Sequence, residues 1–514
     1  MGVMSPTMAV DAMKQHVNVP GVQETGCHVI ASLACDNDAN RVSIAGAGGI
    51  PVILDAMRQH ANVLGVQEYG CQFIGYLACK NDANRVSIAE AGGIPMILDA
   101  MRQHADVSVV QDRGCWAIVL LANGNKANCD SIANAGGIPV ILDAMRRYSN
   151  EHRIQNKCCM AIAALACEND ANRVSIAEAG CIPVILDAMR QHVNVSDVQE
   201  NGCGAIANLA RGIQANCVSM ANAGGVPVIL DAMRQHLGVS RVQESGFLAI
   251  ANLTNRREDA IDARFVEAGG IPVILDAMRQ HVNVSDVQQS GCNALGSLSW
   301  NNEATSVIAK AGGIPVILNA MRQHANVSGV QENGCFVIAN LAFYNEANRV
   351  SIAEAGGIPV ILDAMRRHVN ESGVQENGCQ AIGYLALDNE PNSVGIAKAG
   401  GILVILDAMR QHANEADIQE WGCEAIKNLA DGNNGANSVS IVEAGGIPVI
   451  LDAMRQHANE SGVQDSGCWA ITNLACGNDV SIADAGGISV ILDAMRQRNM
   501  QVFQVYRNVV VMRL

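Results

Sequence analysis

A unit of about 44 residues recurs from one end of this chain to the other. Its clearest mark is the motif Ala-Gly-Gly-Ile-Pro, found at residues 47–51, 91–95, 135–139 and 355–359. The Ala-Gly pair begins at residues 47, 91, 135, 179, 223, 268, 311, 355, 399, 444 and 485, which makes eleven copies. A period of this length is typical of solenoids, in which each unit buries its apolar face against the next. The repeat therefore predicts one continuous core rather than several globular domains.

The segment 81–121 illustrates how one unit begins. Asp82 is the expected N-cap of a short first helix, and Gly92 is expected to end that helix in a left-handed conformation. Pro95 then falls in the first turn of a second helix, where its missing N–H does no harm. Apolar residues follow at helical spacing, and His104 closes the second helix.

A third helix follows in each unit. Ser328 to Gln331 is interpreted as a capping box, and the same pattern begins at Ser196, Ser285, Ser372 and Ser461. Small and apolar residues recur after Val198 at offsets 4, 7, 8, 11 and 12, which is a one-sided stripe of helical period. Each unit is thus expected to contain three helices.

Three helices per unit, the Gly-Gly-Ile-Pro junction and a third helix ending in Ala-Asn-Leu-Ala resemble the armadillo repeat. The resemblance covers residues 8–497. It implies an all-α, right-handed superhelical solenoid of about eleven three-helix repeats. In that family the third helices line a concave groove that binds partner polypeptides. The array is expected to span residues 1–498, with a truncated first unit, and an atypical apolar tail follows at 499–514.

Composition excludes several classes of partner. The net charge is −16, and no basic cluster is longer than Arg256-Arg257, so nucleic acid is not an expected partner. No run of 18 apolar residues is present, so we expect no membrane insertion. Ten of the 18 cysteines recur once per unit, beside the buried stripe, which predicts reduced packing residues and a reducing compartment. We expect the cytoplasm, with the nucleus as the other candidate.

No catalytic, metal or cofactor site is expected. The chain has no Cys-x-x-Cys pair, and ten of its twelve histidines share the last turn of the second helix, where an imidazole suits the helix C-terminus. The Gly-Gly pairs lie between helices and lack the strand and the Gly-Lys-Ser/Thr ending of a phosphate loop. Every recurring Ser or Cys has a capping or packing role, so the chain is predicted not to be an enzyme.

Three positions of the third helix vary freely between copies and are predicted to form one exposed ladder. In the copy at Val198 they are Asn201, Gly204 and Asn208. Exposed aromatic residues in a concave strip are typical of partner recognition, although packing between adjacent third helices is the alternative. Seven of the 16 aromatic residues fall on the ladder: Tyr69, Tyr76, Trp116, Phe336, Tyr384, Trp421 and Trp469.

The last ladder position is asparagine in five copies: Asn208, Asn252, Asn340, Asn428 and Asn473. In armadillo proteins that carry nuclear cargo, an asparagine here holds the backbone of an extended peptide, and a tryptophan one turn earlier packs against its side chains. The resemblance implies the same roles in this chain. Trp469 and Asn473 alone form the full pair, which argues against a nuclear-transport adaptor.

A row of acidic residues runs beside the ladder, in the first turn of the third helices. The macrodipole alone justifies acids there, but their combined field also favours basic or neutral polypeptide partners. Arg113 and Lys157 interrupt the pattern on the ladder itself. The row consists of Glu24, Glu68, Asp112, Glu200, Glu244, Glu332, Glu376, Glu420 and Asp465.

Irregular segments leave some questions open. The loop around residues 256–259 gains one residue and is either neutral drift or a local contact point. The first unit lacks its first helix and the tail after Val502 is apolar, so weak end-to-end self-association is expected. We predict a non-catalytic scaffold that binds polypeptides in its groove. A nuclear-transport adaptor and an architectural spacer, as a fragment of a larger protein, remain the alternatives.

Overall fold

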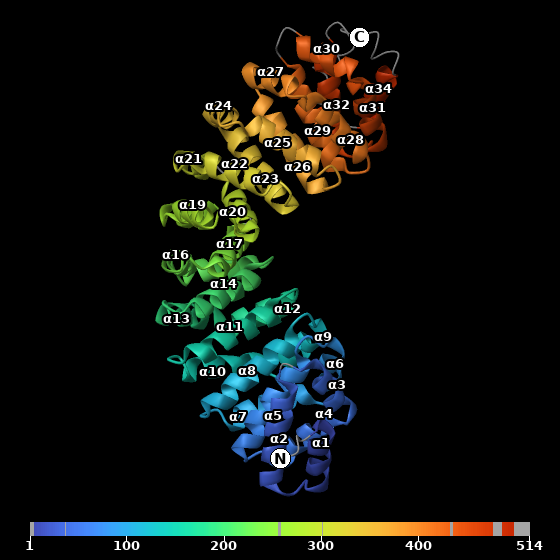
Figure 1. Ribbon diagram of the computed structural model, residues 1–514. Helices are drawn as coiled ribbons and strands as arrows, with labels where there is room; N and C mark the ends of the chain where they lie inside the picture. The colour runs from blue at the N-terminus through green and yellow to red at the C-terminus, as the bar shows by residue number, and fades with distance from the viewer. Residues whose placement is uncertain are drawn as a thin grey trace. The chain divides into compact units, whose positions relative to one another are not determined.

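The computed structural model describes residues 5–35, 37–254, 259–300, 302–431, 435–475 and 486–497, and its regular elements there are all helices (Figure 1). The chain divides into two compact units, Met1–Arg256 (unit 1) and Arg257–Leu514 (unit 2). The division falls within the irregular loop recognised in the sequence. Residues 255–258 and the apolar tail lie outside the described residues, so the predictions made for them, and that of a single array over 1–498, stay predictions.

In its described residues, unit 1 contains six second helices, six third helices and five first helices. The first helices are α3 (Asp38–Gly46), α6 (Asp82–Glu90), α9 (Lys126–Asn134), α12 (Asp170–Glu178) and α15 (Gln214–Asn222). The second helices are α1 (Pro6–Gln15), α4 (Gly49–Gln59), α7 (Gly93–Gln103), α10 (Gly137–Arg147), α13 (Cys181–Gln191) and α16 (Gly225–Gln235). The third helices are α2 (Pro20–Ala34), α5 (Leu64–Ala78), α8 (Ser108–Ala122), α11 (His152–Ala166), α14 (Ser196–Ala210) and α17 (Ser240–Thr254).

Unit 2 repeats the pattern. Its first helices are α18 (Asp259–Glu267), α21 (Asn302–Lys310), α24 (Glu346–Glu354), α27 (Glu390–Lys398) and α30 (Ala436–Glu443). Its second helices are α19 (Gly270–Gln280), α22 (Gly313–Gln323), α25 (Gly357–Arg367), α28 (Gly401–Gln411), α31 (Gly446–Gln456) and α34 (Gly487–Gln497). Its third helices are α20 (Ser285–Leu298), α23 (Ser328–Tyr344), α26 (Ser372–Ala386), α29 (Ala416–Ala430) and α32 (Ser461–Leu474).

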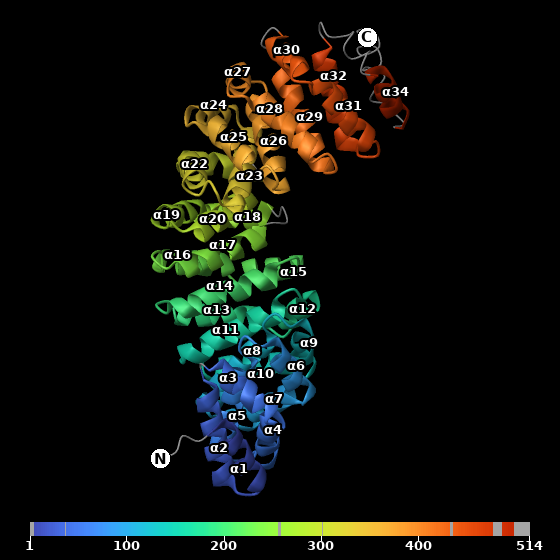
Figure 2. The ribbon, with the colours of Figure 1, turned by 45° about the vertical axis from the view of Figure 1, so that its right-hand side comes forward.

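The helices of each kind form separate rows. Within unit 1, Figure 1 shows the second helices α10, α13 and α16 along one edge and the first helices α9 and α12 along the opposite edge. In Figure 2, α13 and α16 again lie opposite the first helices α12 and α15. Consecutive third helices make the most extensive helix contacts within each unit. This stacking is the all-α solenoid of armadillo-type repeats that the sequence predicts.

The junction between first and second helices follows the prediction, with one correction. Gly92 adopts the left-handed conformation at φ +84°, Pro95 lies in the first turn of α7, and His104 is the C-cap. The N-cap of α6, however, is Asn81, whose side chain accepts a hydrogen bond from the backbone N–H of Asn84. The prediction for Asp82 was wrong by one residue, because asparagine and aspartate are both good caps and stand next to each other here.

The capping-box prediction was wrong. The N-cap of α23 is Val327, and no side chain caps this helix; Ser328 is its first residue. Gln331 instead lies buried and donates from Nε2 to the carbonyl oxygens of Met321 and His324, at 3.0 and 2.9 Å. The glutamine therefore satisfies the C-terminal carbonyls of the preceding second helix. The same pair of bonds is made by Gln23, Gln67, Gln111, Gln155, Gln199, Gln243, Gln288, Gln375, Gln419 and Gln464.

The recurring histidines join neighbouring repeats. His104 Nε2 lies 2.7 Å from the carbonyl oxygen of Ala61, one repeat earlier, and His236 makes the same contact with Val193. Because a carbonyl oxygen only accepts, Nε2 must carry the proton at these positions. Tyr148 takes the place of histidine in one copy and donates from its hydroxyl to Ala105. The histidine row is thus part of the framework.

Small residues let the second and third helices approach closely. A Cβ atom added to Gly114 would lie 2.5 Å from Cγ of Met101, so methionine occupies the space above the glycine. Ten recurring cysteines lie buried beside this contact, which confirms their predicted packing position: Cys27, Cys71, Cys115, Cys159, Cys203, Cys292, Cys335, Cys379, Cys423 and Cys468. Two cysteines of neighbouring third helices lie closer together than the repeat predicts. Cys158 replaces the usual glycine, and its Sγ lies 3.4 Å from Sγ of Cys115.

No single helix among the described residues is long and apolar enough to cross a membrane. Two pairs of consecutive helices are long and apolar enough when each pair is taken as one segment, but both pairs are bent. The bend is 76° between α21 and α22 and 72° between α27 and α28.

Candidate functional site

The candidate site is the row of ladder positions on the third helices. The packing of these helices fixes which face is available: Val198, Cys203 and Leu209 of α14 are fully buried, whereas Asn201, Gly204 and Asn208 keep part of their surface exposed. Because the same offsets recur in every third helix, the ladder residues of successive copies lie on successive helices of each stack.

The ladder asparagines are tied to the preceding third helix. Asn208 Nδ2 donates to the carbonyl oxygen of Ala163 at 2.9 Å, and Asn428 Nδ2 donates to that of Gly383 at 3.0 Å. An asparagine amide has two N–H donors and one carbonyl, so this bond uses one donor. Asn252 and Asn473 make the same contact with Ala207 and Lys427.

Exposure separates the five asparagines into two groups. Asn340 donates to the hydroxyl of Ser299 at 2.9 Å and, like Asn428, is only 5% exposed. Asn208, Asn252 and Asn473 remain half-buried. The half-buried side chains are therefore the ones that a peptide backbone can reach most easily.

The ladder aromatics of unit 1 pack in pairs. The rings of Tyr76 and Trp116 lie 5.1 Å apart in an edge-to-face arrangement. Gly75 makes room for the indole, since a Cβ atom there would lie 2.6 Å from the ring of Trp116. Tyr69 packs against the ring of His28 at 4.6 Å. Packing between neighbouring third helices, the alternative that the sequence left open, is thus observed, although all of these rings keep part of their surface exposed.

The ladder aromatics of unit 2 extend over more helices. Phe336 packs against Trp300 with ring centroids 5.4 Å apart. Tyr384 lies between two rings, 4.6 Å from Phe343 and 5.6 Å from Trp421. Phe343 was not predicted, because it lies in the final turn of α23, beyond the ladder offsets. The sequence signal was its position, because the same offset holds Trp300 in the preceding copy.

Trp469 is the most exposed ladder aromatic. It is 40% exposed, and it precedes Asn473 by one helical turn on α32. The structure therefore places all seven aromatics and all five asparagines on the third helices, but it distributes them between two units.

The acidic row lies at the start of the third helices. Glu332 reaches over the first turn of the next third helix, α26, where a Cβ atom on Gly373 would lie 2.6 Å from its carboxyl carbon. Glu24 and Glu420 stand in the same relation to Gly65 and Gly462. The glycine leaves space for the carboxylate at a helix N-terminus, where the macrodipole favours a negative charge.

Basic side chains offset these acids in unit 1. Asp112 Oδ1 lies 2.7 Å from Nζ of Lys157, and Arg113 is 3.9 Å from its other oxygen. Burial raises the pKa of Glu200, whereas the neighbouring Arg241 lowers it. The third helices of unit 1 contain four Lys or Arg residues: Arg113, Arg153, Lys157 and Arg241.

The third helices of unit 2 contain one basic residue, Lys427, and it is paired with Glu424. Burial raises the pKa of the Glu376 carboxyl, and the carboxylates around it, with Asp417 first, raise it further. Burial also raises the pKa of Glu420, again with Asp417 as the strongest of its acidic neighbours. These acids repel one another, and none of the neighbours that shift their pKa values is a base.

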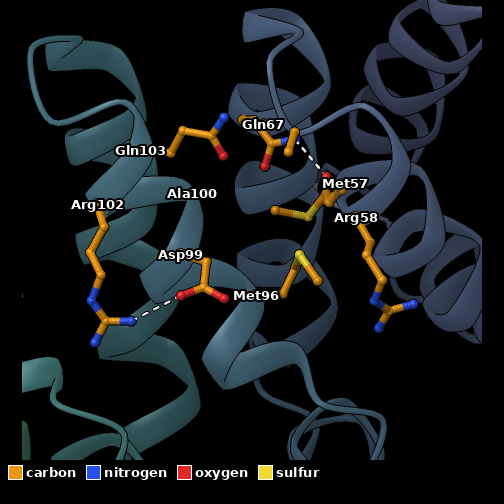
Figure 3. A pocket seen from close by; sticks show the side chains of 9 residues that line it. Met57, Arg58, Gln67, Met96, Asp99, Ala100, Arg102 and Gln103 are labelled. Carbon is orange, nitrogen blue, oxygen red and sulfur yellow. Dashed lines mark hydrogen bonds and ion pairs between the residues drawn. The ribbon is translucent and has the colours of Figure 1, made fainter.

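A second kind of hollow lies between successive second helices. Figure 3 shows the one between α4 and α7, with a volume of about 490 Å³. Gln67 donates to the carbonyl of Met57 at its inner end, and Arg102 pairs with Asp99 at 2.9 Å (Figure 3). Similar hollows recur at α7–α10, α19–α22 and α28–α31. Their linings consist of framework residues, and no group of three or more metal-binding side chains occurs in the part of the chain that the structure describes.

The sequence matches the family model of the LRRK2 ARM repeat over residues 82–259 and 228–401, which together exceed half of the chain. The chain belongs to the LRRK2 ARM repeat family. This membership agrees with the predicted resemblance to armadillo repeats. None of the curated proteins matches the sequence significantly.

Two solved structures share the fold of this ARM-repeat chain. An engineered protein solved by the Northeast Structural Genomics Consortium is 23% identical with a TM-score of 0.72, covering 83% of this chain and 99% of its own. A structure from work described as "A conserved phosphorylation switch controls the interaction between cadherin and beta-catenin in vitro and in vivo" is 15% identical with a TM-score of 0.70, covering 92% and 91%. At such identities the likeness shows the fold alone.

Proposed function

We propose that this chain is a non-catalytic interaction scaffold that binds extended polypeptides along the ladder of its third helices. The observation that carries the proposal is the row of large rings that keep part of their surface exposed, with Trp469 at 40%. Aromatic side chains bury much area on binding and lose little conformational entropy, so they dominate many interfaces. The neighbouring structure concerns a cadherin–β-catenin interaction, which supports a polypeptide as the partner.

Charge supports a basic or neutral partner. The carboxylates of unit 2 are offset by one paired lysine in the third helices, so a basic segment gains favourable electrostatic energy there. A nucleic acid backbone would meet the same carboxylates and be repelled. Steering of this kind weakens as salt is added.

A nuclear-transport adaptor remains the second candidate, and Trp469 with Asn473 is the observation that favours it. The other half-buried asparagines lack a tryptophan one turn earlier: Gly204 precedes Asn208 and Leu248 precedes Asn252. A purely architectural spacer would leave the ladder without a ligand. The test below separates this last role from binding.

We also propose a cytoplasmic location, with the nucleus as the alternative. The buried packing of the recurring cysteines supports a reducing compartment, since burial raises the pKa of Cys203 and Cys292 to about 12 and suits neutral thiols. Alkylation of the native-source protein under non-reducing denaturation should modify all 18 cysteines. Two or more protected cysteines would place the protein in an oxidising compartment.

The proposal is tested by selecting random peptides of about 16 residues on the full chain, a length that spans several third helices spaced about 10 Å apart. Selected peptides should lose binding when Trp421→Ala and Trp469→Ala are combined. The matched control combines Val42→Ala and Leu403→Ala, which remove exposed apolar side chains of α3 and α28. Equal loss in both variants, or no selected peptide at all, would contradict ladder binding.

A further inference from the structure

Three rings from three consecutive third helices of unit 2 form one continuous surface. Phe343 of α23 lies 4.6 Å from Tyr384 of α26, and Tyr384 lies 5.6 Å from Trp421 of α29. Phe343 is 45% exposed, and the other two rings keep part of their surface exposed. We name Phe343, Tyr384 and Trp421 the aromatic surface.

Carboxylates stand beside the aromatic surface. Glu420 directly precedes Trp421, whereas Glu424, one turn later on α29, is already paired with Lys427. Glu376 lies in the second turn of α26, and burial together with the neighbouring acids raises the pKa of its carboxyl. The charges around these rings are therefore negative and partly desolvated, which strengthens their attraction for a cation.

Unit 1 provides an internal comparison with similar rings and different charges. Tyr76 and Trp116 also meet edge-to-face, at 5.1 Å. Arg113 precedes Trp116 by one turn. The hydrogen bond with Cys35 and burial raise the pKa of Tyr76, and the positive charge of Arg113 acts in the opposite direction. A cation approaching this pair would meet a positive charge. The ring geometry alone therefore does not select a cationic ligand, but the carboxylates of unit 2 do.

Resting on the proposed function, we propose that the aromatic surface and its neighbouring carboxylates bind arginine side chains of an extended basic polypeptide. The guanidinium is planar and weakly hydrated, so it stacks on aromatic rings and pairs with carboxylates at the same time. A lysine ammonium is a compact, strongly hydrated charge and gains less from the rings. Arginine is therefore preferred to lysine, and both are preferred to neutral or acidic side chains.

The test measures fluorescence polarisation of labelled peptides with the full chain. Each probe is about 12 residues long, which spans roughly 40 Å when extended, and carries four arginines separated by Gly and Ser. Three matched probes replace every arginine by lysine, by the neutral isostere citrulline, or by glutamate. We expect the citrulline probe to bind about tenfold more weakly than the arginine probe, since it loses the charge and keeps the shape.

Variants locate the binding. Trp421→Ala should weaken the arginine probe about tenfold, and Glu376→Gln combined with Glu420→Gln about fivefold with a smaller dependence on salt. Trp116→Ala in unit 1 should change the affinity less than about twofold, because Arg113 repels the probe there. Phe343→Ala is the second variant if Trp421→Ala perturbs the helices, since Phe343 is 45% exposed.

The outcomes distinguish this inference from the proposed function. Equal affinity for the arginine and citrulline probes, or equal loss in Trp116→Ala and Trp421→Ala, would overturn the arginine site. If peptides selected on the ladder are neutral or acidic and Trp421→Ala still abolishes their binding, the scaffold function stands and the arginine preference fails. If no peptide of any charge binds, both fail.

Discussion

Units 1 and 2 share one framework and differ in the chemistry of their third helices. In both, a buried glutamine satisfies the end of the second helix, as Gln111 and Gln375 do with almost identical bond lengths. The third helices of unit 1 contain four Lys or Arg residues, whereas those of unit 2 contain one. Positions that hold the repeat together are thus constant. The residues that differ between the two units lie on the ladder and beside it.

The largest expected effect tests the shared framework. Gln111→Ala in unit 1 and Gln375→Ala in unit 2 should each destabilise their repeat by about 3 kcal/mol, because a buried carbonyl loses its side-chain donor and a part-buried one keeps only its backbone donor. Local unfolding by hydrogen exchange is the appropriate measurement, since repeats of a solenoid open individually. A clearly unequal loss in the two units would show that their frameworks are not equivalent.

Two ladder asparagines, one from each unit, should differ because their exposure differs. Asn428→Ala should destabilise α29 by about 2 kcal/mol, since the buried carbonyl of Gly383 is left without its donor. Asn208→Ala should lose about 1 kcal/mol, because Asn208 is half-buried and water can replace its bond to Ala163. Hydrogen exchange of the two helices checks both values, and the reverse order would contradict the exposures described above.

The aromatic pairs should contribute equally to stability in both units. A double-mutant cycle on Tyr76 and Trp116, and another on Tyr384 and Trp421, should each give a coupling of about 1 kcal/mol. The two pairs are both edge-to-face at similar distances. Couplings that agree while peptide affinities differ would show that charge, rather than ring packing, separates the units. A coupling near zero in one unit would break this interpretation.

The smallest expected effect is pH-dependent. Burial and neighbouring acids raise the pKa of Glu376 above its unfolded value, so the folded chain takes up a proton first as the pH falls. The charged Glu376 carboxylate therefore lowers the free energy of unfolding at neutral pH. This free energy rises as the pH falls from the raised pKa of the folded state towards the lower pKa of the unfolded state. Glu376→Gln should stabilise unit 2 at neutral pH by up to about 0.5 kcal/mol after allowance for solvent screening.

This gain should vanish below the unfolded pKa, where the native glutamate is protonated in both states. Glu200→Gln in unit 1 is the matched variant and should gain less, because Arg241 already offsets that charge. Thermal melts at a series of pH values measure both. A gain for Glu376→Gln that persists at acid pH would mean that lost charge repulsion is not its cause.

The architecture was predictable because the repeat supplies many copies of the same evidence. Left-handed Gly92 and the closing His104 were recognised from residue type and position alone. The glutamine was misassigned to a capping box, because Ser-x-x-Gln matches that motif locally and its true partners, the carbonyls of Met321 and His324, lie in the preceding helix. Hydrogen bonds between helices are not visible in local spacing.

The candidate site was predictable in position but not in detail. Ladder offsets placed Tyr384 and Trp421 on third helices, yet the sequence did not indicate that their rings meet or that Phe343 joins them. Tyr384 and Trp421 stand seven residues apart when their two repeats are aligned, so their rings meet only because the neighbouring helices are staggered. That stagger is a property of the tertiary structure. The burial of Asn428 and the exposure of Trp469 follow from the same packing.

The central claim is that polypeptides bind along the ladder. The most direct measurement introduces the photo-crosslinking residue p-benzoylphenylalanine at Trp469 on α32 or, in a separate protein, at Leu403 on α28. These positions are 40% and 55% exposed, so both are accessible to a ligand. With a peptide selected on the unmodified chain, the account predicts strong crosslinking from position 469 and almost none from position 403. Equal yields, or a stronger yield from position 403, would contradict it.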